Sequence, residues 1–349
     1  MTKHVVLVTP GFPANEQDSA AVPYLQDYCR HLSAVIGADN ITVVTTQYPF
    51  TRTPYRWKGI QVLPAGGANK KGFCYPLLLW RTQRLLRSAC ADPNTVVHAF
   101  WLTDAAMHAA RVARKKNLPC IVTLMGQDVN PGNRWFSLMH ANVRYVALSE
   151  QQKEQFTQQY HTPVEAVIPF PLPDITPAYH IHRTIDLLFI GSYIAVKRPL
   201  QFIEIVHEIR QLHPGIRAVM IGGGPLQAEM EAKMQELGLE HNLIIHPMMS
   251  REHVLSTMQH AHILVHTSAS EGQCLVYGEA LLSGMHVLSY AVGNITATPK
   301  HQVCNDKRDF VLKAMELLAR PINFTPVQTV DARASIDAYL ALYEMPVSR

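Results

Sequence analysis

The chain alternates short apolar runs with longer segments of helical pattern, and it does so on both sides of a proline cluster. The apolar runs have the length of strands, and the segments between them are long enough for crossover helices. Runs that are apolar on both faces are typical of buried parallel strands. Strands are expected in the first half at residues 5–9, 41–45, 95–99, 120–124 and 145–148. The first half is therefore predicted to be α/β.

Prolines interrupt the pattern at residues 168–177, where both helix and strand are disfavoured. The alternation then resumes, with strands expected at residues 186–190, 217–221, 243–246, 262–266 and 286–290. A chain of 349 residues is long for one hydrophobic core, so two domains are expected. The predicted parts are a first domain at 1–170, a linker at 171–182, a second domain at 183–320 and a tail at 321–349. The last helical stretch, around 332–343, extends the second domain or crosses back to the first.

Composition narrows the classes of function. The net charge of +4 is too small to indicate a nucleic-acid partner. Six cysteines without a C-x-x-C pair indicate neither a zinc ribbon nor a disulfide framework, and they favour a reducing, cytoplasmic compartment. The apolar run near the N-terminus has strand length rather than the length of a signal peptide's core. No stretch approaches the roughly 20 apolar residues that cross a bilayer.

The most informative segment is residues 268–284, SASEGQCLVYGEALLSG. It follows an expected strand, and a helix is predicted to begin near Cys274 and to end at Gly284. The backbone N–H groups at 272–275 would then form a helix N-terminus, which is suited to phosphate. Glu271 in the loop and Glu279 in the helix are suited to accept hydrogen bonds from sugar or ribose hydroxyls. The structural alternative is a solvated loop acid and an acid on a helix face.

Two glutamates separated by seven residues, among small residues and a glycine, resemble the motif of retaining GT-B glycosyltransferases, especially the family 4 group. Further segments resemble landmarks of that family: 96–101, 123–128, 147–150, 189–198 and 219–226. The resemblance extends over residues 3–290. It implies two Rossmann-like domains whose parallel sheets face a cleft between them. It also implies transfer of a hexose or related sugar from a nucleoside-diphosphate sugar, with retention, to a glycan or lipid-linked acceptor.

The resemblance also implies roles for individual residues. Glu279 would bind the ribose, Glu271 the transferred sugar, and Lys197 the diphosphate, whose charge grows in the transition state. In the first domain, His98 is expected at the donor sugar and Asp128 at the acceptor or sugar, with a hydrogen-bonded core position as the alternative for each. The expected catalytic contacts are Glu271, Lys197, His98 and Asp128, and the expected donor-binding residues are Glu279, Gly272, Gln273, Cys274, Leu275, Arg198 and Gly11.

The chain departs from the family pattern at three places. Ser192 stands where the family has an arginine, and Met125 where many relatives have a histidine. Ala20 and Ala21 replace paired glycines in the loop that approaches the diphosphate, and a methyl group there hinders close approach. These departures motivate a first alternative, a nucleotide-binding or partner protein that transfers no sugar. A second alternative is a nucleotide-sugar epimerase.

Two other signals are rejected as cofactor sites. Gly222, Gly223 and Gly224 do not form a dinucleotide fingerprint, because its third glycine would fall on Gln227. They precede Pro225 and a predicted helix on which Glu229 and Lys233 would pair. His262 and His266 would share a strand face, but no carboxylate or cysteine nearby completes a metal set. No metal or other cofactor is expected, and the GT-B family generally uses basic residues and helix dipoles instead.

Arg81, Arg84 and Arg87 recur every three residues beside apolar positions. The spacing predicts a basic amphipathic helix, which is suited to anionic lipid or is simply a solvated surface helix. The expected location is therefore cytoplasmic, with peripheral contact at the cytoplasmic face of the membrane left open.

Overall fold

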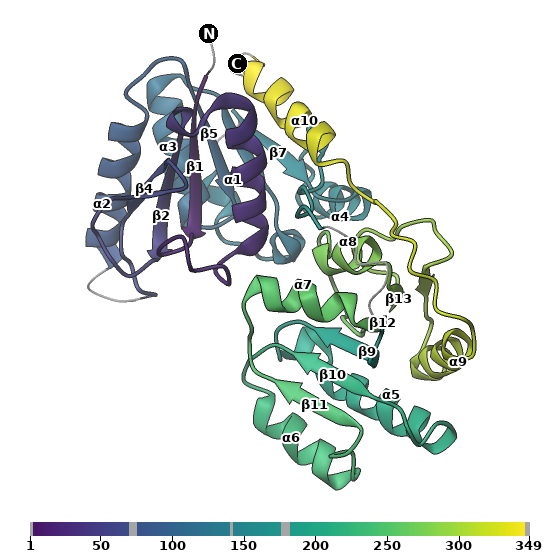
Figure 1. Cartoon of the computed structure of the whole chain (residues 1–349). Helices are drawn as coiled ribbons and strands as arrows, with labels where there is room; N and C mark the ends of the chain where they lie inside the picture. The colour runs from purple at the N-terminus through teal and green to yellow at the C-terminus, as the bar shows by residue number, and fades with distance from the viewer. Residues whose placement is uncertain (1–2, 70–74, 140–141, 176–181, 346–349) are drawn as a thin grey trace. The chain divides into compact units, whose positions relative to one another are not determined.

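A computed structural model describes residues 3–69, 75–139, 142–175 and 182–345. The chain divides into two compact units, Met1–Pro171 with Asp331–Arg349, and Leu172–Val330. Each unit has a sheet of mostly parallel strands flanked by helices (Figure 1). The α/β prediction is therefore confirmed. Residues 176–181 of the expected linker lie outside the described residues.

The described part of the first unit contains an eight-stranded sheet in the order β3-β4-β2-β1-β5-β6-β7-β8. The antiparallel pair β3 and β4 closes one edge, and the other strands are parallel. The strands are β1 His4–Gly11, β2 Ile41–Tyr48, β3 Tyr55–Trp57, β4 Ile60–Pro64, β5 Thr95–Phe100, β6 Cys120–Thr123, β7 Val143–Ala147 and β8 Ala166–Val167. All of β5, β6 and β7 is buried, which explains why these runs are apolar on both faces.

Helices cover both faces of this sheet (Figure 1). They are α1 Pro23–Ile36, α2 Tyr75–Ala89, α3 Asp104–Lys116, α4 Glu150–Tyr160 and α10 Ala332–Glu344, with short 3-10 helices at Ala38–Asn40, Gly126–Val129 and Phe136–Leu138. The buried face of α3 is largely alanine, which lets this helix approach the sheet closely. The helix α10 contacts α1 and belongs to the first unit, whereas residues 321–330 of the expected tail belong to the second.

The described part of the second unit contains a six-stranded parallel sheet in the order β11-β10-β9-β12-β13-β14. The strands are β9 Ile185–Ile190, β10 Ala218–Ile221, β11 Leu243–His246, β12 Ala261–His266, β13 His286–Ser289 and β14 His301–Val303. The helices are α5 Pro199–Leu212, α6 Gln227–Glu236, α7 Arg251–Gln259, α8 Leu275–Leu282 and α9 Lys307–Leu318, with a 3-10 helix η5 at Ala195–Lys197. The central strands β9 and β12 are neighbours, so the loops at their carboxyl ends are adjacent.

One predicted contact on α6 is wrong. Lys233 pairs with Glu236, at 3.2 Å between Nζ and Oε1, rather than with Glu229. The helix begins at Gln227, two residues after Pro225, because the chain first makes a turn at Gly224. Elsewhere in the fold, no helix in the described ranges is both long and apolar enough to span a bilayer.

Candidate functional site

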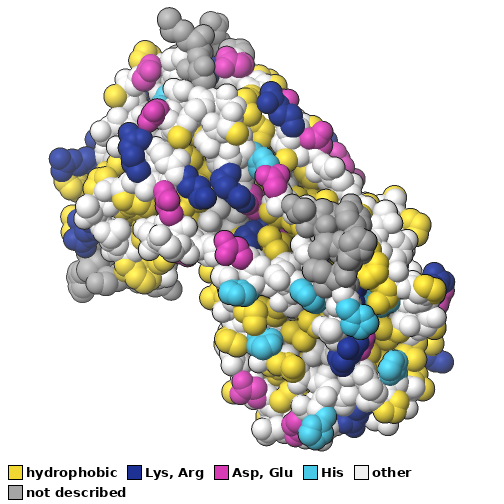
Figure 2. Space-filling view, viewed as in Figure 1, with side chains coloured by type: hydrophobic (Ala, Val, Ile, Leu, Met, Phe, Trp, Pro, Cys, Tyr) yellow, Lys and Arg dark blue, Asp and Glu magenta, His cyan; other side chains and the backbone are white. Residues whose placement is uncertain are grey.

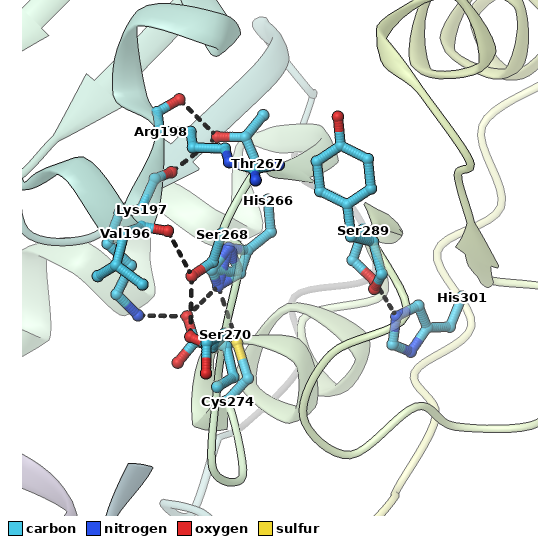
Figure 3. A network of polar contacts seen from close by, with 12 residues as sticks. Val196, Lys197, Arg198, His266, Thr267, Ser268, Ser270, Cys274, Ser289 and His301 are labelled. Carbon is cyan, nitrogen blue, oxygen red and sulfur yellow. Dashed lines mark hydrogen bonds and ion pairs between the residues drawn. The ribbon is translucent and has the colours of Figure 1, made fainter. Parts of the chain in front are cut away.

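The loop after β12 is held against η5 by hydrogen bonds (Figure 3). Thr267 Oγ1 donates to the carbonyl oxygens of Lys197 and Arg198, each at 2.9 Å. Ser268 Oγ donates to Val196 O at 3.2 Å. Because β9 and β12 are adjacent, these short side chains bridge the two loops directly. This bridging brings the side chain of Lys197 to the loop that carries the first glutamate of the motif.

A polar cluster forms where these loops meet. Lys197 Nζ forms an ion pair with Glu271 Oε1. His266 Nε2 lies 3.0 Å from the same carboxylate oxygen and 2.9 Å from Cys274 Sγ. Figure 3 shows Lys197, His266 and Cys274 pointing toward one another. Burial, followed by the charge of Lys197, lowers the pKa of His266 to about 3, so this imidazole is neutral at physiological pH.

The start of α8 fixes the backbone around the cluster. Cys274 is the N-cap and has a left-handed φ of 56°. Gly293 lies against it, and a Cβ at this glycine would be 3.0 Å from Cys274 Cβ and 3.1 Å from Glu271 Cβ. Asn294 N donates to Gln273 O at 3.1 Å. Burial, with Glu271 second, raises the pKa of the Cys274 thiol well above its ordinary value, so the thiol is protonated.

The expected donor-binding positions occupy the start of this helix. Gly272 and Gln273 are buried, and Leu275 is the first residue of α8. Glu279 is also buried, on the same helix. The structure therefore brings the segment 271–279 together with Lys197 in one region of the second unit. The donor-binding roles of these residues stay predictions.

Arg251 is a residue of this region that no pattern in the sequence indicated. It begins α7, and its Nη2 lies 2.6 Å from Glu279 Oε1. The exposed fractions of the two side chains are 17% and 7%, so this ion pair is mostly shielded from water. The two residues are 28 positions apart on different helices, and no short-range spacing in the sequence indicates such a pair.

The glycine turn after β10 lies against the loop after β9. A Cβ at Gly222 would lie 1.9 Å from Gly191 O, and one at Gly224 would lie 2.5 Å from Tyr193 O. Tyr193 N donates to Gly223 O at 2.9 Å, and its hydroxyl donates to His246 O at the end of β11. These glycines therefore allow the loops at the carboxyl ends of neighbouring strands to meet backbone to backbone.

Arg198 and Ser192 occupy the same loop region, and both are exposed. Arg198 has a left-handed φ of 48°, and its guanidinium lies 5.5 Å from the centroid of the Tyr290 ring. This stacking directs the side chain toward β13. The structure does not place the Arg198 guanidinium in the cluster around Glu271, where Lys197 is the cation that makes contact.

His98 lies inside the first unit. It has no exposed surface, and its Nε2 is 2.8 Å from Thr123 Oγ1 while its Nδ1 is 2.6 Å from the hydroxyl of Tyr343. Burial lowers the pKa of His98 to about 3, so the imidazole is neutral. Both ring nitrogens have partners within the core. This geometry agrees with the structural alternative for His98 and does not support a contact with the donor sugar.

Asp128 is also engaged within the first unit. Its Oδ2 accepts hydrogen bonds from Leu102 N at 2.8 Å and from Met125 N at 2.7 Å. The residue is 5% exposed, and burial raises the pKa of its carboxyl to about 6 in spite of these two donors. The carboxylate therefore organises the loops after β5 and β6. This role again agrees with the structural alternative, and Met125 takes part through its backbone.

The loop after β1 is built around Asp18, a residue that no motif in the sequence indicated. Its carboxylate accepts hydrogen bonds from Ala14 N at 3.0 Å, Ala21 N at 3.1 Å and the Tyr48 hydroxyl at 2.8 Å. Gly11 ends β1, and a Cβ there would make only ordinary contacts at 3.7 Å. The loop therefore reaches its shape through one acidic side chain rather than through paired glycines.

One group of possible metal ligands occurs among the described residues. His266, Glu271 and Cys274 each offer a ligand atom, and these atoms lie within 4.8 Å of one another. The sequence indicated no carboxylate or cysteine near His262 and His266 that completes a metal set, and the structure brings Glu271 and Cys274 to His266. The chain turns back after β12, so residues five and eight positions further on return to the end of the strand.

Comparison with known proteins bears on the second unit most directly. Residues 178–323 match the family of glycosyl transferases group 1. A segment of 111 residues is 24% identical to one subunit of the phosphatidylinositol N-acetylglucosaminyltransferase of Arabidopsis thaliana, and covers 32% of this chain and 25% of that protein. A segment of 100 residues is 28% identical to the gpi3 subunit of the same transferase of Schizosaccharomyces pombe, and covers 28% and 22%. The match thus spans about a quarter of each relative.

Solved structures resemble the chain over nearly its whole length. An alpha,alpha-trehalose-phosphate synthase (UDP-forming) from Burkholderia vietnamiensis has a TM-score of 0.69 at 11% identity, over 98% of this chain and 95% of that one. WaaG, a glycosyltransferase involved in lipopolysaccharide biosynthesis, has a TM-score of 0.65 at 15% identity, over 97% and 95%. At these identities the likeness establishes the fold. The chain therefore has the GT-B fold, and residues 178–323 are similar to the glycosyl transferases group 1.

Proposed function

We propose that the chain transfers a sugar from a nucleoside-diphosphate sugar, with UDP or GDP as the nucleotide, to a glycan or lipid-linked acceptor with retention of configuration. The observation that carries this proposal is the ion pair between Lys197 and Glu271 at the start of α8, with Glu279 further along the same helix. A cation, a helix N-terminus and two acids in one region offer partners for a diphosphate and for sugar hydroxyls.

The proposed mechanism assigns the diphosphate to Lys197 and to the backbone at 272–275. Negative charge grows on the leaving diphosphate, and a fixed cation with a helix N-terminus stabilises it more in the transition state than in the ground state. Lys197 exchanges its contact with Glu271 for the diphosphate when the donor binds. Glu271 then accepts hydrogen bonds from the sugar, and Glu279, held by Arg251, accepts them from the ribose.

Retention does not require a protein base in this proposal. A donor phosphate oxygen takes the acceptor's proton on the face from which the diphosphate departs, so that the new bond forms on that same face. Lys197 and the helix dipole supply the positive charge, and transfer is proposed to be metal-independent. In this proposal His98 and Asp128 take no part in the chemistry, and the hydrogen bonds that both side chains make within the first unit support that assignment.

The curated relatives favour the lipid branch of the acceptor proposal. Both are named as subunits of a phosphatidylinositol N-acetylglucosaminyltransferase, and each matches about a third of this chain or less. We therefore propose a lipid-linked acceptor ahead of a free glycan. A retained anomer in the product, measured by NMR, is expected. An inverted anomer would refute the mechanism, and an altered nucleotide sugar formed without acceptor would favour the epimerase.

The donor site is tested by thermal unfolding with UDP, GDP, ADP and NAD. A nucleotide at 100 times its Kd adds about 2.7 kcal/mol to stability. One nucleoside diphosphate should raise the melting temperature of the wild type. Glu279→Ala should lose most of that increase, because the substitution removes the carboxylate that is proposed to bind the ribose. Glu240→Ala, which changes an exposed acid of the same unit, is the control and should keep the stabilisation by the nucleotide. If no nucleotide stabilises the wild type, the donor-site proposal is wrong.

We also propose that α2 makes peripheral contact with an anionic membrane surface. Leu77 and Trp80 are 52% and 57% exposed on this helix, and the guanidinium of Arg84 lies 5.7 Å from the Trp80 ring centroid. Figure 2 shows basic and hydrophobic side chains next to one another where α2 lies in Figure 1. Arg81 is turned inward and donates to Ala65 O at 3.0 Å, so Arg84 and Arg87 carry the surface charge.

Vesicle co-sedimentation tests this contact. The wild type should bind vesicles that contain an anionic phospholipid and should lose binding as salt is raised. Trp80→Glu should reduce that binding strongly because it places a carboxylate at the lipid surface. Leu312→Glu alters an equally exposed apolar residue of the second unit and serves as the control. Equal binding of the wild type and Trp80→Glu would exclude α2 as the contact.

A further inference from the structure

Nitrogen, oxygen and sulfur ligands meet at the start of α8. His266 Nε2 lies 3.0 Å from Glu271 Oε1 and 2.9 Å from Cys274 Sγ, and all three ligand atoms fall within 4.8 Å of one another. Zinc binds such atoms at about 2.0 to 2.3 Å in a tetrahedron, which places neighbouring ligand atoms about 3 to 4 Å apart. The observed spacing is therefore close to that of a three-ligand zinc site with one open position.

Rigid elements hold these ligands in place. His266 is the last residue of β12, is 3% exposed, and its ring lies 5.1 Å from that of Tyr277. Cys274 is fixed by its left-handed turn against Gly293, as described above. Glu271 lies between them in sequence and reaches the same point. The site therefore needs little rearrangement to close around a cation.

Cys274 and His266 distinguish this cluster from a group of carboxylates that offers oxygen ligands alone. Thiolate and imidazole ligands select zinc and other thiophilic cations over magnesium and calcium, which prefer oxygen. The chemistry of the ligand set therefore indicates the class of cation. Binding releases the proton of the thiol, because the thiolate is the species that coordinates the metal.

We propose that His266, Glu271 and Cys274 form a binding site for zinc that is inhibitory. Lys197 contacts the carboxylate that zinc would take, and a dication and an ammonium group at one oxygen repel each other. Zinc binding therefore displaces Lys197 and withdraws Glu271 from the donor. This consequence rests on the proposed function, because it assumes that both residues contact the donor. The proposal that zinc binds at this site does not rest on the proposed function.

Cobalt(II) is the probe for the metal site, used on the tag-free full chain. One equivalent should produce the near-ultraviolet charge-transfer absorption of a thiolate–cobalt bond, and added zinc should remove it. Figure 2 shows histidines spread over the visible face of the second unit, and such side chains bind cobalt without this absorption. Cys274→Ser should abolish the band. Cys304→Ser, a change at a buried cysteine of the same unit, should leave it intact.

Two further variants keep the thiolate and test the other contacts. Glu271→Gln should keep the band but weaken the metal affinity by about tenfold or more, because it removes a charged ligand. Lys197→Met should strengthen the affinity by about tenfold, because it removes a nearby positive charge. The same Lys197→Met change should weaken nucleotide binding under the proposed function, so the two effects have opposite signs.

The outcomes separate the two proposals. No charge-transfer band in the wild type, or a band that survives in Cys274→Ser, would overturn the zinc site whatever the nucleotides do. If Cys274→Ser does not fold, the metal affinities of Glu271→Gln and Lys197→Met test the site instead. A metal affinity that is unchanged in both variants would overturn the zinc site. A cobalt band in a protein that no nucleotide stabilises would keep the zinc site and reject the donor site.

Discussion

The carboxylate of Asp128 is stabilised by two backbone donors and yet has a raised pKa. Leu102 N and Met125 N both donate to Oδ2, which favours the charged form. Burial favours the neutral form and is the larger effect, so the pKa rises from 3.8 to about 6. The folded protein therefore binds this proton more tightly than the unfolded chain does. The stability that follows is present below pH 3.8 and is lost as the pH rises through about 6.

Asp128→Asn should remove this dependence on pH. The asparagine oxygen can still accept the backbone N–H groups, but the side chain no longer titrates. The stability of the wild type relative to the variant should fall by up to about 3 kcal/mol between pH 4 and pH 7. Urea unfolding of the first unit at pH 4, 5.5 and 7 measures this difference. Asp39→Asn, at an exposed acid, is the control, and a difference that is constant with pH would contradict the assignment.

The grouping of residues was predictable where the motif is local and not where the partners are distant in sequence. Glu271 and Glu279 belong to one continuous segment, and the structure brings it to Lys197. His98 is hydrogen-bonded to Tyr343, 245 positions away, and no short-range pattern shows that its nitrogens already have partners. The same limit applies to Arg251, which reaches Glu279 from another helix.

The turn after β10 gives a prediction at the scale of elements. A Cβ at Gly222 would overlap Gly191 O at 1.9 Å, whereas a Cβ at Gly223 meets nothing within 4 Å. Gly222→Ala should therefore force the two loops apart and destabilise the second unit by about 3 kcal/mol. Gly223→Ala is the adjacent control and should change stability by less than about 0.5 kcal/mol. Thermal unfolding compares the two, and equal stability would show that the loops are not in close contact.

The strands that are apolar on both faces were predictable, and several strands at or near the sheet edges were not. Each strand expected from a two-sided apolar run is present, because burial on both faces requires that composition. The strands at Tyr55–Trp57, Ile60–Pro64, Ala166–Val167 and His301–Val303 were missed. Three of them contain two or three residues, too few for a periodicity to appear. The strand Ile60–Pro64 has five residues, but its buried positions alternate with more exposed ones, so it is not apolar on both faces. Their pairing is decided by the neighbouring strand rather than by their own sequence.

At the scale of the whole molecule, the course of the C-terminal tail was left open by the sequence. An amphipathic helix can pack on either unit, because its apolar stripe does not specify which surface it covers. The structure assigns α10 to the first unit, where Tyr339 and Tyr343 are buried beside Tyr28 and His98. The chain thus leaves the first unit, builds the second and returns. The stability of the first unit therefore depends on residues that follow the second.

Tyr339→Ala tests this dependence. The ring is fully buried, its hydroxyl lies 3.2 Å from Thr123 Oγ1, and its loss leaves a cavity beside His98. The first unit should lose about 3 to 5 kcal/mol, as large aromatic truncations do. Hydrogen exchange of β5 and β6 should accelerate, while exchange in β9 and β12 stays unchanged, because α10 belongs to the first unit. Arg333→Ala, at an exposed position of the same helix, is the control and should alter neither. Faster exchange in both units, or in neither, would contradict an α10 that stabilises only the first.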